Sequence, residues 1–177
     1  MTKAVFFDAD GTLWSSASGL HPDIVRNKII DMYLVNGEMS EIEKYVDEEL
    51  RLDPKLIPVM EKLSENDVKV AVVSDHIQEC LTGIIDHFGI RHYFDVIVTS
   101  SLVQAKKEDL APIKYAMFKL GARNKDVIMV GDSYERDIVP SKKLGIDAYL
   151  LRTDYNLNKE SNYFFSLSEV PAVLGID

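Results

Sequence analysis

The chain has 177 residues, of which 46% are hydrophobic and 28% are charged, as in an ordinary globular domain. Its formal net charge of −9 argues against a surface for nucleic acid or an anionic membrane, because both need clustered cations. No apolar run approaches the roughly 18 residues of a membrane span, and the apolar stretch near the N-terminus is too short for a signal peptide. The single cysteine, Cys80, excludes an intramolecular disulfide and a cysteine-based zinc cluster. We therefore expect a cytoplasmic protein with no nucleic-acid or membrane partner, whose oligomeric state the sequence leaves open.

Short apolar runs that are nearly continuous in hydrophobicity are typical of strands buried on both faces. They span residues 4–7, 68–73, 96–99, 127–130 and 148–151. Helical patterns lie between or after them, at 56–63, 80–88, 110–120 and 138–144, and a short strand and a helix close the chain at 163–165 and 167–174. This alternation predicts an α/β fold with a doubly wound parallel sheet.

The gap between the first two apolar runs is too long for a single crossover helix. One helical pattern begins at His21-Pro22 and ends near Asn36-Gly37. Ser40 and Glu43 then predict a capping box at the start of a second helix, which ends near Leu50. We expect residues 15–52 to form a small two-helix insertion, and residues 1–14 and 53–177 to form the core domain.

Polar residues lie just beyond four of the predicted strands. They are Asp8-Ala9-Asp10-Gly11-Thr12, Ser74-Asp75, Lys106-Lys107 and Gly131-Asp132-Ser133. The carboxyl ends of parallel strands line one crevice, so Asp8, Ser74, Lys107 and Asp132, which are 66, 33 and 25 positions apart in turn, are expected to share one site. Carboxylates without histidine or cysteine favour Mg²⁺ over zinc. Because a lysine and a hydroxyl suit phosphate oxygens, the set predicts Mg²⁺-dependent phosphoryl transfer.

Asp8 and Asp10 are two positions apart, so in an extended stretch they point the same way and can flank one phosphate. One carboxylate can attack phosphorus and form an aspartyl-phosphate. The other can protonate the leaving oxygen and later deprotonate the water that hydrolyses the intermediate. Gly11 permits the tight turn that brings both carboxylates close to a ligand.

The same residues resemble the motifs of the haloacid dehalogenase (HAD) superfamily. Asp8-Ala9-Asp10-Gly11-Thr12 is similar to its first motif, Ser74 to its second, Lys107 to its third, and Gly131-Asp132-Ser133 with Asp137 to its fourth. The resemblance covers nearly the whole chain and implies a Rossmann-like HAD core with a reduced helical cap at residues 15–52. Because Asp10 is present, it also implies a phosphatase rather than a dehalogenase. A reduced cap leaves the pocket open, so the expected substrate is a small phosphorylated metabolite, with phosphorylated side chains on a macromolecule as the alternative.

The resemblance also implies individual roles. Asp8 is similar to the nucleophile and Asp10 to the general acid/base, which makes these two the catalytic pair. The other implied roles are phosphate binding by Thr12, Ser74, Asp75 and Lys107; Mg²⁺ binding by Asp8, by Asp10 through its carbonyl, and by Asp132; and support by Ser133 and Asp137.

Several assignments stay open at this stage. Glu108 follows Lys107 where the family usually has proline, and Lys106 is adjacent, although counting back from Leu120-Gly121 favours Lys107. Asp75 replaces the commoner asparagine and is an alternative cap for the next helix. Asp137 has two interpretations. It is either a carboxylate that supports the site, by lying beside the metal or by orienting Lys107, or a charged residue of a helix with no role in the site. His76 is either a substrate contact or, more simply, a surface histidine. Trp14 lies either at the pocket entrance or in the core.

Two other functions use similar residues. A sugar phosphomutase forms the same aspartyl-phosphate but returns the phosphoryl group to sugar, and a small insertion argues against it because a mutase must exclude water. A receiver-like phospho-acceptor module also combines aspartates, a hydroxyl, lysine and Mg²⁺. Its acceptor aspartate follows the third strand, however, and here nothing acidic follows residues 96–99 until Glu108.

Overall fold

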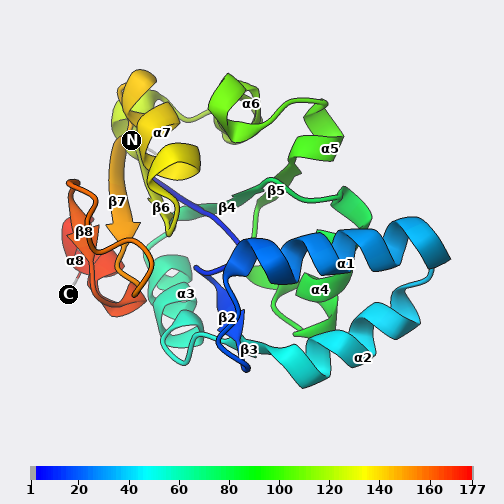
Figure 1. Ribbon diagram of the computed structural model, residues 1–177. Coiled ribbons are helices and arrows are strands. Elements are labelled where there is room, and N and C mark those ends of the chain that lie inside the picture. The colour runs from blue at the N-terminus through cyan, green and yellow to red at the C-terminus, as the bar shows by residue number, and fades with distance from the viewer. Residues whose placement is uncertain (1–2, 177) are drawn as a thin grey trace.

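The computed structural model describes residues 3–176 and has a six-stranded parallel sheet at its centre, in the order β5-β4-β1-β6-β7-β8 (Figure 1). The strands are β1 (Ala4–Phe7), β4 (Lys69–Ser74), β5 (Val96–Thr99), β6 (Val127–Gly131), β7 (Asp147–Leu151) and β8 (Tyr163–Phe164). The predicted α/β class with a doubly wound parallel sheet is confirmed, and the first five strands lie within one residue of their predicted bounds.

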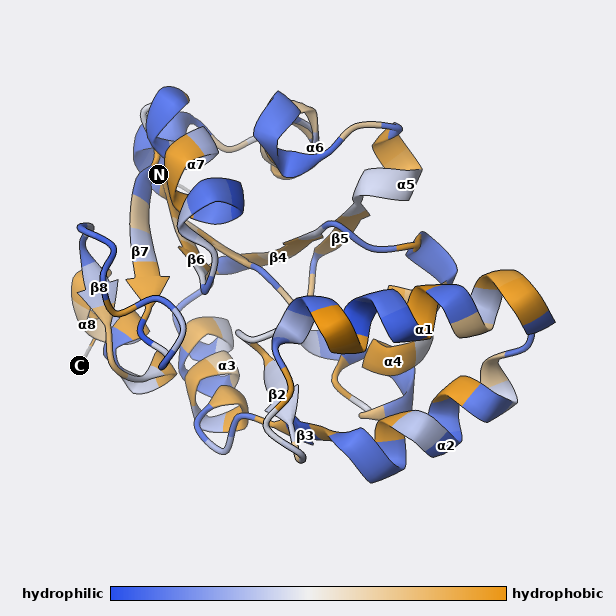
Figure 2. Cartoon of the chain, viewed as in Figure 1, coloured by the Kyte–Doolittle hydropathy of each residue, from blue (hydrophilic) through white to orange (hydrophobic). Residues whose placement is uncertain are grey.

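Side chains of the central strand β1 alternate between the two faces of the sheet, and each face has its own core. Val5 and Phe7 belong to one cluster and Ala4 and Phe6 to the other. The first core is covered by α3 (Leu56–Glu65), α4 (Gln78–His87) and α8 (Val170–Val173). The second is covered by α6 (Ala111–Leu120) and by Ile138 and Leu144, which flank α7 (Val139–Lys143). Figure 2 shows the hydrophobic residues concentrated along the strands. In residues 3–176 no helix is long and apolar enough to cross a membrane.

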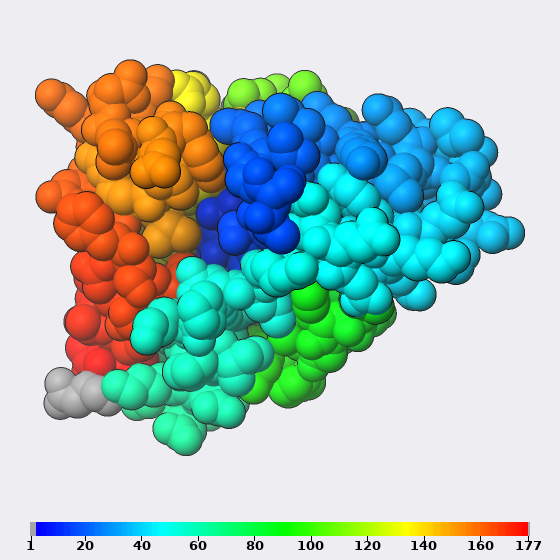
Figure 3. All heavy atoms as spheres, turned by 60° about the horizontal axis from the view of Figure 1, so that its bottom comes forward, coloured from blue at the N-terminus to red at the C-terminus, as the bar shows by residue number. Residues whose placement is uncertain are grey.

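Two helices, α1 (Pro22–Asn36) and α2 (Met39–Glu49), lie between the short strands β2 (Trp14–Ser16) and β3 (Leu50–Leu52). These strands pair antiparallel, and the whole segment projects from the body as a lobe beside α4 (Figure 3). Buried residues of α1 and α2 share the core cluster that includes α4, so the lobe packs on the sheet's own apolar layer. The β2–β3 ribbon was not predicted, because three-residue strands carry too little hydrophobic pattern.

The ends of α1 follow the sequence signals, whereas the start of α2 does not. Pro22 opens α1, where its missing N–H costs nothing, and Gly37 closes the helix in the left-handed conformation. The predicted capping box at Ser40 and Glu43 is wrong: α2 begins at Met39, and Glu38 occupies the N-cap without a side-chain hydrogen bond. The left-handed Gly37 and the extended Glu38 form the turn between the helices, so α2 begins directly after this turn, before Ser40.

Candidate active site

Acidic residues and one lysine lie together at the carboxyl edge of the sheet. The Lys107 Nζ lies 2.5 Å from Asp8 Oδ1 and 2.6 Å from Asp137 Oδ1. One carboxylate oxygen of each of Asp8, Asp132 and Asp137 lies within 4.8 Å of the others. Each of these four side chains belongs to a residue that is 5% exposed or less. The site therefore concentrates three carboxylates around one ammonium, away from bulk water.

The backbone around Asp8 is fixed by the sheet. Its N–H donates to the carbonyl of Val130 on β6, which continues the pairing of β1 beyond the strand end. Gly11 then turns the chain with φ +80°, and its N–H donates to the Trp14 carbonyl at 2.9 Å. A Cβ at this position would lie 2.4 Å from Asp132 Oδ2, so only glycine allows the two loops to approach this closely.

Asp137 is held by a π-helical turn, Tyr134–Ile138, directly after the β6 loop. The Ser133 N–H donates to Asp137 Oδ2 at 3.0 Å, while the Ser133 hydroxyl accepts the Arg136 N–H at 3.3 Å. The first bond leaves Asp137 Oδ1 facing Lys107, so this carboxylate contacts the lysine rather than solvent. π-Helical turns of this kind are frequently found at functional sites.

Burial and neighbouring charges raise the pKa values of the acidic groups in the site and of Lys107, for different reasons. Burial and the neighbouring Asp8 carboxylate raise the pKa of Asp10 to about 6. Burial raises the pKa of Asp137 to about 6 despite its contact with Lys107, and burial with Asp8 and Asp137 raises that of Asp132. Burial alone would lower the pKa of Lys107, but Asp137 and Asp8 raise it. The lysine therefore stays charged while the carboxylates compete for compensating cations.

Several polar atoms of the predicted site are buried without a hydrogen-bond partner. They are Asp10 Oδ2, Thr12 Oγ1, Ser74 Oγ, Asp75 Oδ2 and Asp132 Oδ1. The other Asp10 oxygen accepts the Trp14 indole N–H at 3.0 Å, so Trp14 is a buried residue that also orients Asp10. Because buried polar atoms are normally paired, these free oxygens indicate a place that a polar ligand occupies.

Lys106 and Asp75 have different surroundings from Lys107. Lys106 is exposed, and Lys107 is the lysine that reaches Asp8. Asp75 does not cap α4, whose N-cap is Ile77; instead its Oδ1 accepts the backbone N–H of Lys107 at 3.1 Å. Asp75 thus holds the loop that carries Lys107, a contact between residues 32 positions apart that local sequence does not reveal.

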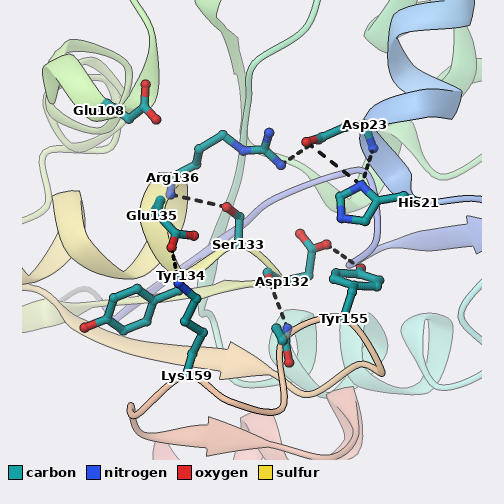
Figure 4. Close-up of a pocket in the computed structure, with 11 residues that line it drawn as sticks. His21, Asp23, Glu108, Asp132, Ser133, Tyr134, Glu135, Arg136, Tyr155 and Lys159 are labelled. Carbon is teal, nitrogen blue, oxygen red and sulfur yellow. Dashed lines mark hydrogen bonds and ion pairs between the residues drawn. The ribbon is translucent and has the colours of Figure 1, made fainter.

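Two residues that the sequence did not reveal, Tyr155 and Asn156, lie in the loop between β7 and β8 and contact Asp132. Figure 4 shows Tyr155 beside Asp132. The Tyr155 hydroxyl donates to Asp132 Oδ2 at 2.5 Å, and the Asn156 amide donates to the Asp132 carbonyl at 2.8 Å. This leaves Asp132 Oδ1 free. Tyr155 also packs on His21, the N-cap of α1, with ring centroids 4.6 Å apart. No sequence motif marks this loop, because its role depends on tertiary contacts alone.

A cleft of about 300 Å³ opens beside Asp132, between the first turn of α1 and the core. Its wall includes Asp23 of α1, which forms ion pairs with Arg136 at 2.7 Å and with Arg26 at 3.1 Å. Burial alone would raise the pKa of Asp23, but the Arg136 guanidinium lowers it below its usual value. In Figure 4 Asp23 and Arg136 point toward each other across the cleft.

The expectation that His76 lies on the surface is wrong. His76 is 1% exposed, and its backbone carbonyl accepts the N–H of Ser101, which joins the loop after β4 to the short helix α5 (Ser100–Val103). Cys80 is buried in the core, as expected of a small apolar side chain.

Comparisons with known proteins agree with this fold. The sequence model of the haloacid dehalogenase-like hydrolase family matches residues 20–151, which include Ser74, Lys107, Asp132 and Asp137. The pyrophosphatase PpaX of Halalkalibacterium halodurans is 34% identical over 119 residues, which is 64% of this chain and 54% of that protein's length. The glyceraldehyde 3-phosphate phosphatase of Methanocaldococcus jannaschii is 23% identical, over 92% of this chain and 91% of its own.

A solved structure shares the whole fold. The HAD phosphatase of Thermococcus onnurineus superposes with a TM-score of 0.79 at 22% identity, and the alignment covers 99% of each chain. With the family match over most of the sequence and this agreement in architecture, the chain belongs to the haloacid dehalogenase-like hydrolase family.

Proposed function

We propose that this protein is a Mg²⁺-dependent phosphatase that hydrolyses a small phosphomonoester through an aspartyl-phosphate on Asp8. The observation that supports this most directly is the Lys107–Asp8 contact, and the buried hydroxyls of Ser74 and Thr12 have no partner of their own. Hydroxyl and ammonium donors beside a carboxylate nucleophile suit a phosphoryl group, whose charged oxygens they neutralise. The names of the two curated relatives are consistent with phosphate ester or anhydride chemistry.

The residues present fit a magnesium ion. Asp8 and Asp132 offer oxygen donors, as does the Asp10 carbonyl, and Asp132 Oδ1 is buried without a partner. Oxygen-only donor sets with few carboxylates are those that Mg²⁺ prefers. When bound, the ion supplies charge neutralisation for the carboxylates and the phosphate together. Ser133 and Asp137 support this arrangement by holding each other and Lys107 in place.

The protein's own groups divide the reaction between them. Lys107 contacts Asp8 Oδ1, which leaves the second oxygen of that carboxylate to attack phosphorus. Asp10, whose pKa burial and Asp8 raise to about 6, gives its proton to the leaving oxygen as the P–O bond breaks. It then accepts a proton from the water that attacks the aspartyl-phosphate, which returns both carboxylates to their starting states. Trp14 holds Asp10 in position through its indole N–H.

The lobe of residues 15–52 acts in this proposal as a reduced cap on a core of residues 1–14 and 53–177. Its helix α1 covers the edge of the site, and the cleft beside Asp132 is about 300 Å³. A cleft of this size suits a small phosphorylated metabolite.

The test is release of inorganic phosphate from p-nitrophenyl phosphate with and without Mg²⁺. We expect EDTA and Asp8→Asn each to abolish release, because one removes the metal and the other the nucleophile. Asp147→Asn is a matched control, since Asp147 is an exposed aspartate at the opposite edge of the sheet. Phosphate release that survives both changes contradicts the proposal. A sugar phosphate that is converted without release of phosphate instead indicates a phosphomutase.

A further inference from the structure

The first residues of the cap reach the loop that follows β1. A Cβ placed on Gly11 would lie 2.7 Å from Pro22 Cγ and 2.7 Å from Tyr155 Oη. The same position is the one that Asp132 Oδ2 approaches. Pro22 opens α1, and Tyr155 lies in the loop between β7 and β8. The start of the cap, the β7–β8 loop and a proposed metal ligand therefore meet at one point.

Two kinds of contact hold the loop that carries Tyr155. Those of Asn156 fix the main chain, because its amide donates to the Asp132 carbonyl at 2.8 Å and its oxygen accepts the Thr153 N–H at 3.0 Å. Tyr155 itself is 42% exposed, so packing from the core does not enclose its ring. Its hydroxyl donates to Asp132, and its ring packs on His21 of the cap. The position of the ring therefore depends on these two partners.

His21 is an unusual residue for the N-cap of α1. Serine, threonine, aspartate and asparagine are the preferred N-caps, because a short side-chain oxygen reaches the N–H groups of the first turn. The His21 Nδ1 accepts the Asp23 N–H at 3.3 Å, which is long for a hydrogen bond. In contrast, its ring centroid lies 4.6 Å from that of Tyr155, with 56° between the planes, which is a favourable aromatic geometry (Figure 4). Packing on Tyr155, rather than capping, therefore accounts for an aromatic ring at this position.

We propose that His21 is a positioning residue for Asp132 and acts through Tyr155. This inference rests on the proposed function, in which Asp132 binds Mg²⁺. The His21 ring limits the rotation of the Tyr155 ring, so the phenol hydroxyl stays on Asp132 Oδ2 and leaves Oδ1 for the ion. Groups that orient a metal ligand in this way tune the affinity of the site for the metal. The cap then contributes to Mg²⁺ binding although it supplies no ligand to the proposed site.

Titration calorimetry with Mg²⁺ in the absence of substrate tests this role, with two variants that separate the ring from the N-cap. His21→Asn keeps a good N-cap and removes the ring. His21→Phe keeps a ring and removes the acceptor of the Asp23 N–H. We expect His21→Asn to weaken the affinity for Mg²⁺ by about three- to tenfold, and His21→Phe to stay within about twofold of the wild-type protein. The reverse order, or equal losses in both variants, overturns the proposal, because capping of α1 is then the property that matters.

A second histidine–tyrosine pair provides the matched control. His92 is exposed and packs on Tyr93 with ring centroids 4.0 Å apart, in the short helical turn Arg91–Tyr93. This turn precedes β5 and so lies at the amino edge of the parallel sheet, whereas Asp132 follows β6 at the carboxyl edge. We expect His92→Asn to leave the affinity for Mg²⁺ unchanged. A loss equal to that of His21→Asn counts against the proposal, because the effect is then not specific to the cap.

A double-mutant cycle tests whether His21 acts through Tyr155. Tyr155→Phe removes the hydroxyl that contacts Asp132, so the His21 ring then has no hydrogen bond to hold in place. We expect His21→Asn to change the affinity for Mg²⁺ by less than about twofold in the Tyr155→Phe protein. Losses that multiply in the double variant mean that the two residues act independently, which overturns the proposal.

The outcomes also separate this inference from the proposed function. All variants are compared at matched folding, judged by thermal melting. If the wild-type protein binds no Mg²⁺, the metal of the proposed function fails, and the positioning role fails with it. If the wild-type protein binds Mg²⁺ and hydrolyses p-nitrophenyl phosphate but His21→Asn keeps the same affinity, the positioning role is wrong and the phosphatase stands.

Discussion

Two charged regions of the molecule differ in how they are held. One is the carboxyl edge of the sheet, here called the rim, with Lys107, Asp8 and Asp137. The other is the gap under α1, where Asp23 meets Arg26 and Arg136. At the rim, Lys107 and Asp137 are essentially inaccessible and lie in the segments that follow β5 and β6. In the gap, the Asp23 side chain is 35% exposed and joins two arginines from separate elements. A buried, pre-positioned network suits charge stabilisation during phosphoryl transfer. A half-buried ion pair that joins two elements opens more easily than the buried network, which suits a substrate entrance.

The largest expected effect is at the rim. Lys107→Met leaves Asp8 and Asp137 buried without their cation, so we expect phosphate release to fall by about 1,000-fold or more. The free energy of unfolding is expected to fall by about 3–5 kcal/mol, because breaking a buried ion pair leaves uncompensated charge. Chemical denaturation and steady-state kinetics measure the two effects. The matched control is Lys106→Met, since Lys106 is exposed, and a greater loss in that variant contradicts the role given to Lys107.

A smaller effect is expected where the rim meets the cap. Tyr155→Phe removes the hydroxyl that holds Asp132 Oδ2, so Asp132 no longer keeps its Oδ1 directed at the proposed metal position. We expect the affinity for Mg²⁺ to fall by about tenfold, as for other groups that orient metal ligands. Titration calorimetry with Mg²⁺ measures this directly. Tyr163→Phe changes an exposed tyrosine on β8 and is expected to have no effect; equal affinities in all three proteins count against the role of Tyr155.

The stability of the metal-free rim is expected to depend on pH. The carboxyls of Asp10 and Asp137 have pKa values of about 6 in the folded chain, above their ordinary value of 3.8. The folded state therefore binds these protons more tightly than the unfolded state, and stability falls as the pH rises from about 4 through about 6. We expect Mg²⁺ to raise the melting temperature by about 3 °C more at about pH 7.5 than at about pH 5. A Mg²⁺ effect that is equal at both pH values disproves this.

The smallest effect is expected in the gap. Asp23→Asn removes the shared anion of Arg26 and Arg136, and for a group this exposed we expect a loss of only about 0–1 kcal/mol in the free energy of unfolding. Amide hydrogen exchange in the first turns of α1 is expected to become faster, because the contact that seats the helix is lost. Asp31→Asn, at an exposed position of the same helix, is the control. Unchanged exchange in α1 indicates that packing of the helix, rather than the ion pair, closes the gap.

The parts of the fold that the sequence predicted well are those in which local pattern and tertiary demand coincide. Five buried strands and α1 lie at or within one residue of their expected bounds, because continuous apolar runs and the Pro22 and Gly37 signals are strong. The β2–β3 ribbon was not predicted, and the predicted start of α2 is wrong. Both features depend on packing, because short strands and exposed helix starts carry little local signal.

The features of the site also fall into those that the sequence predicted and those that only the structure shows. By itself, the sequence determined the kind of chemistry, because acidic and hydroxyl residues at the ends of parallel strands must converge at one edge of the sheet. Only the tertiary structure decided that Tyr155 holds Asp132, that Asp75 holds the loop of Lys107, and that His76 is buried. These contacts join residues far apart in the chain or on loops without periodicity. Their partners are set by how the cap, the core and the β7–β8 loop pack, and no local pattern encodes that packing.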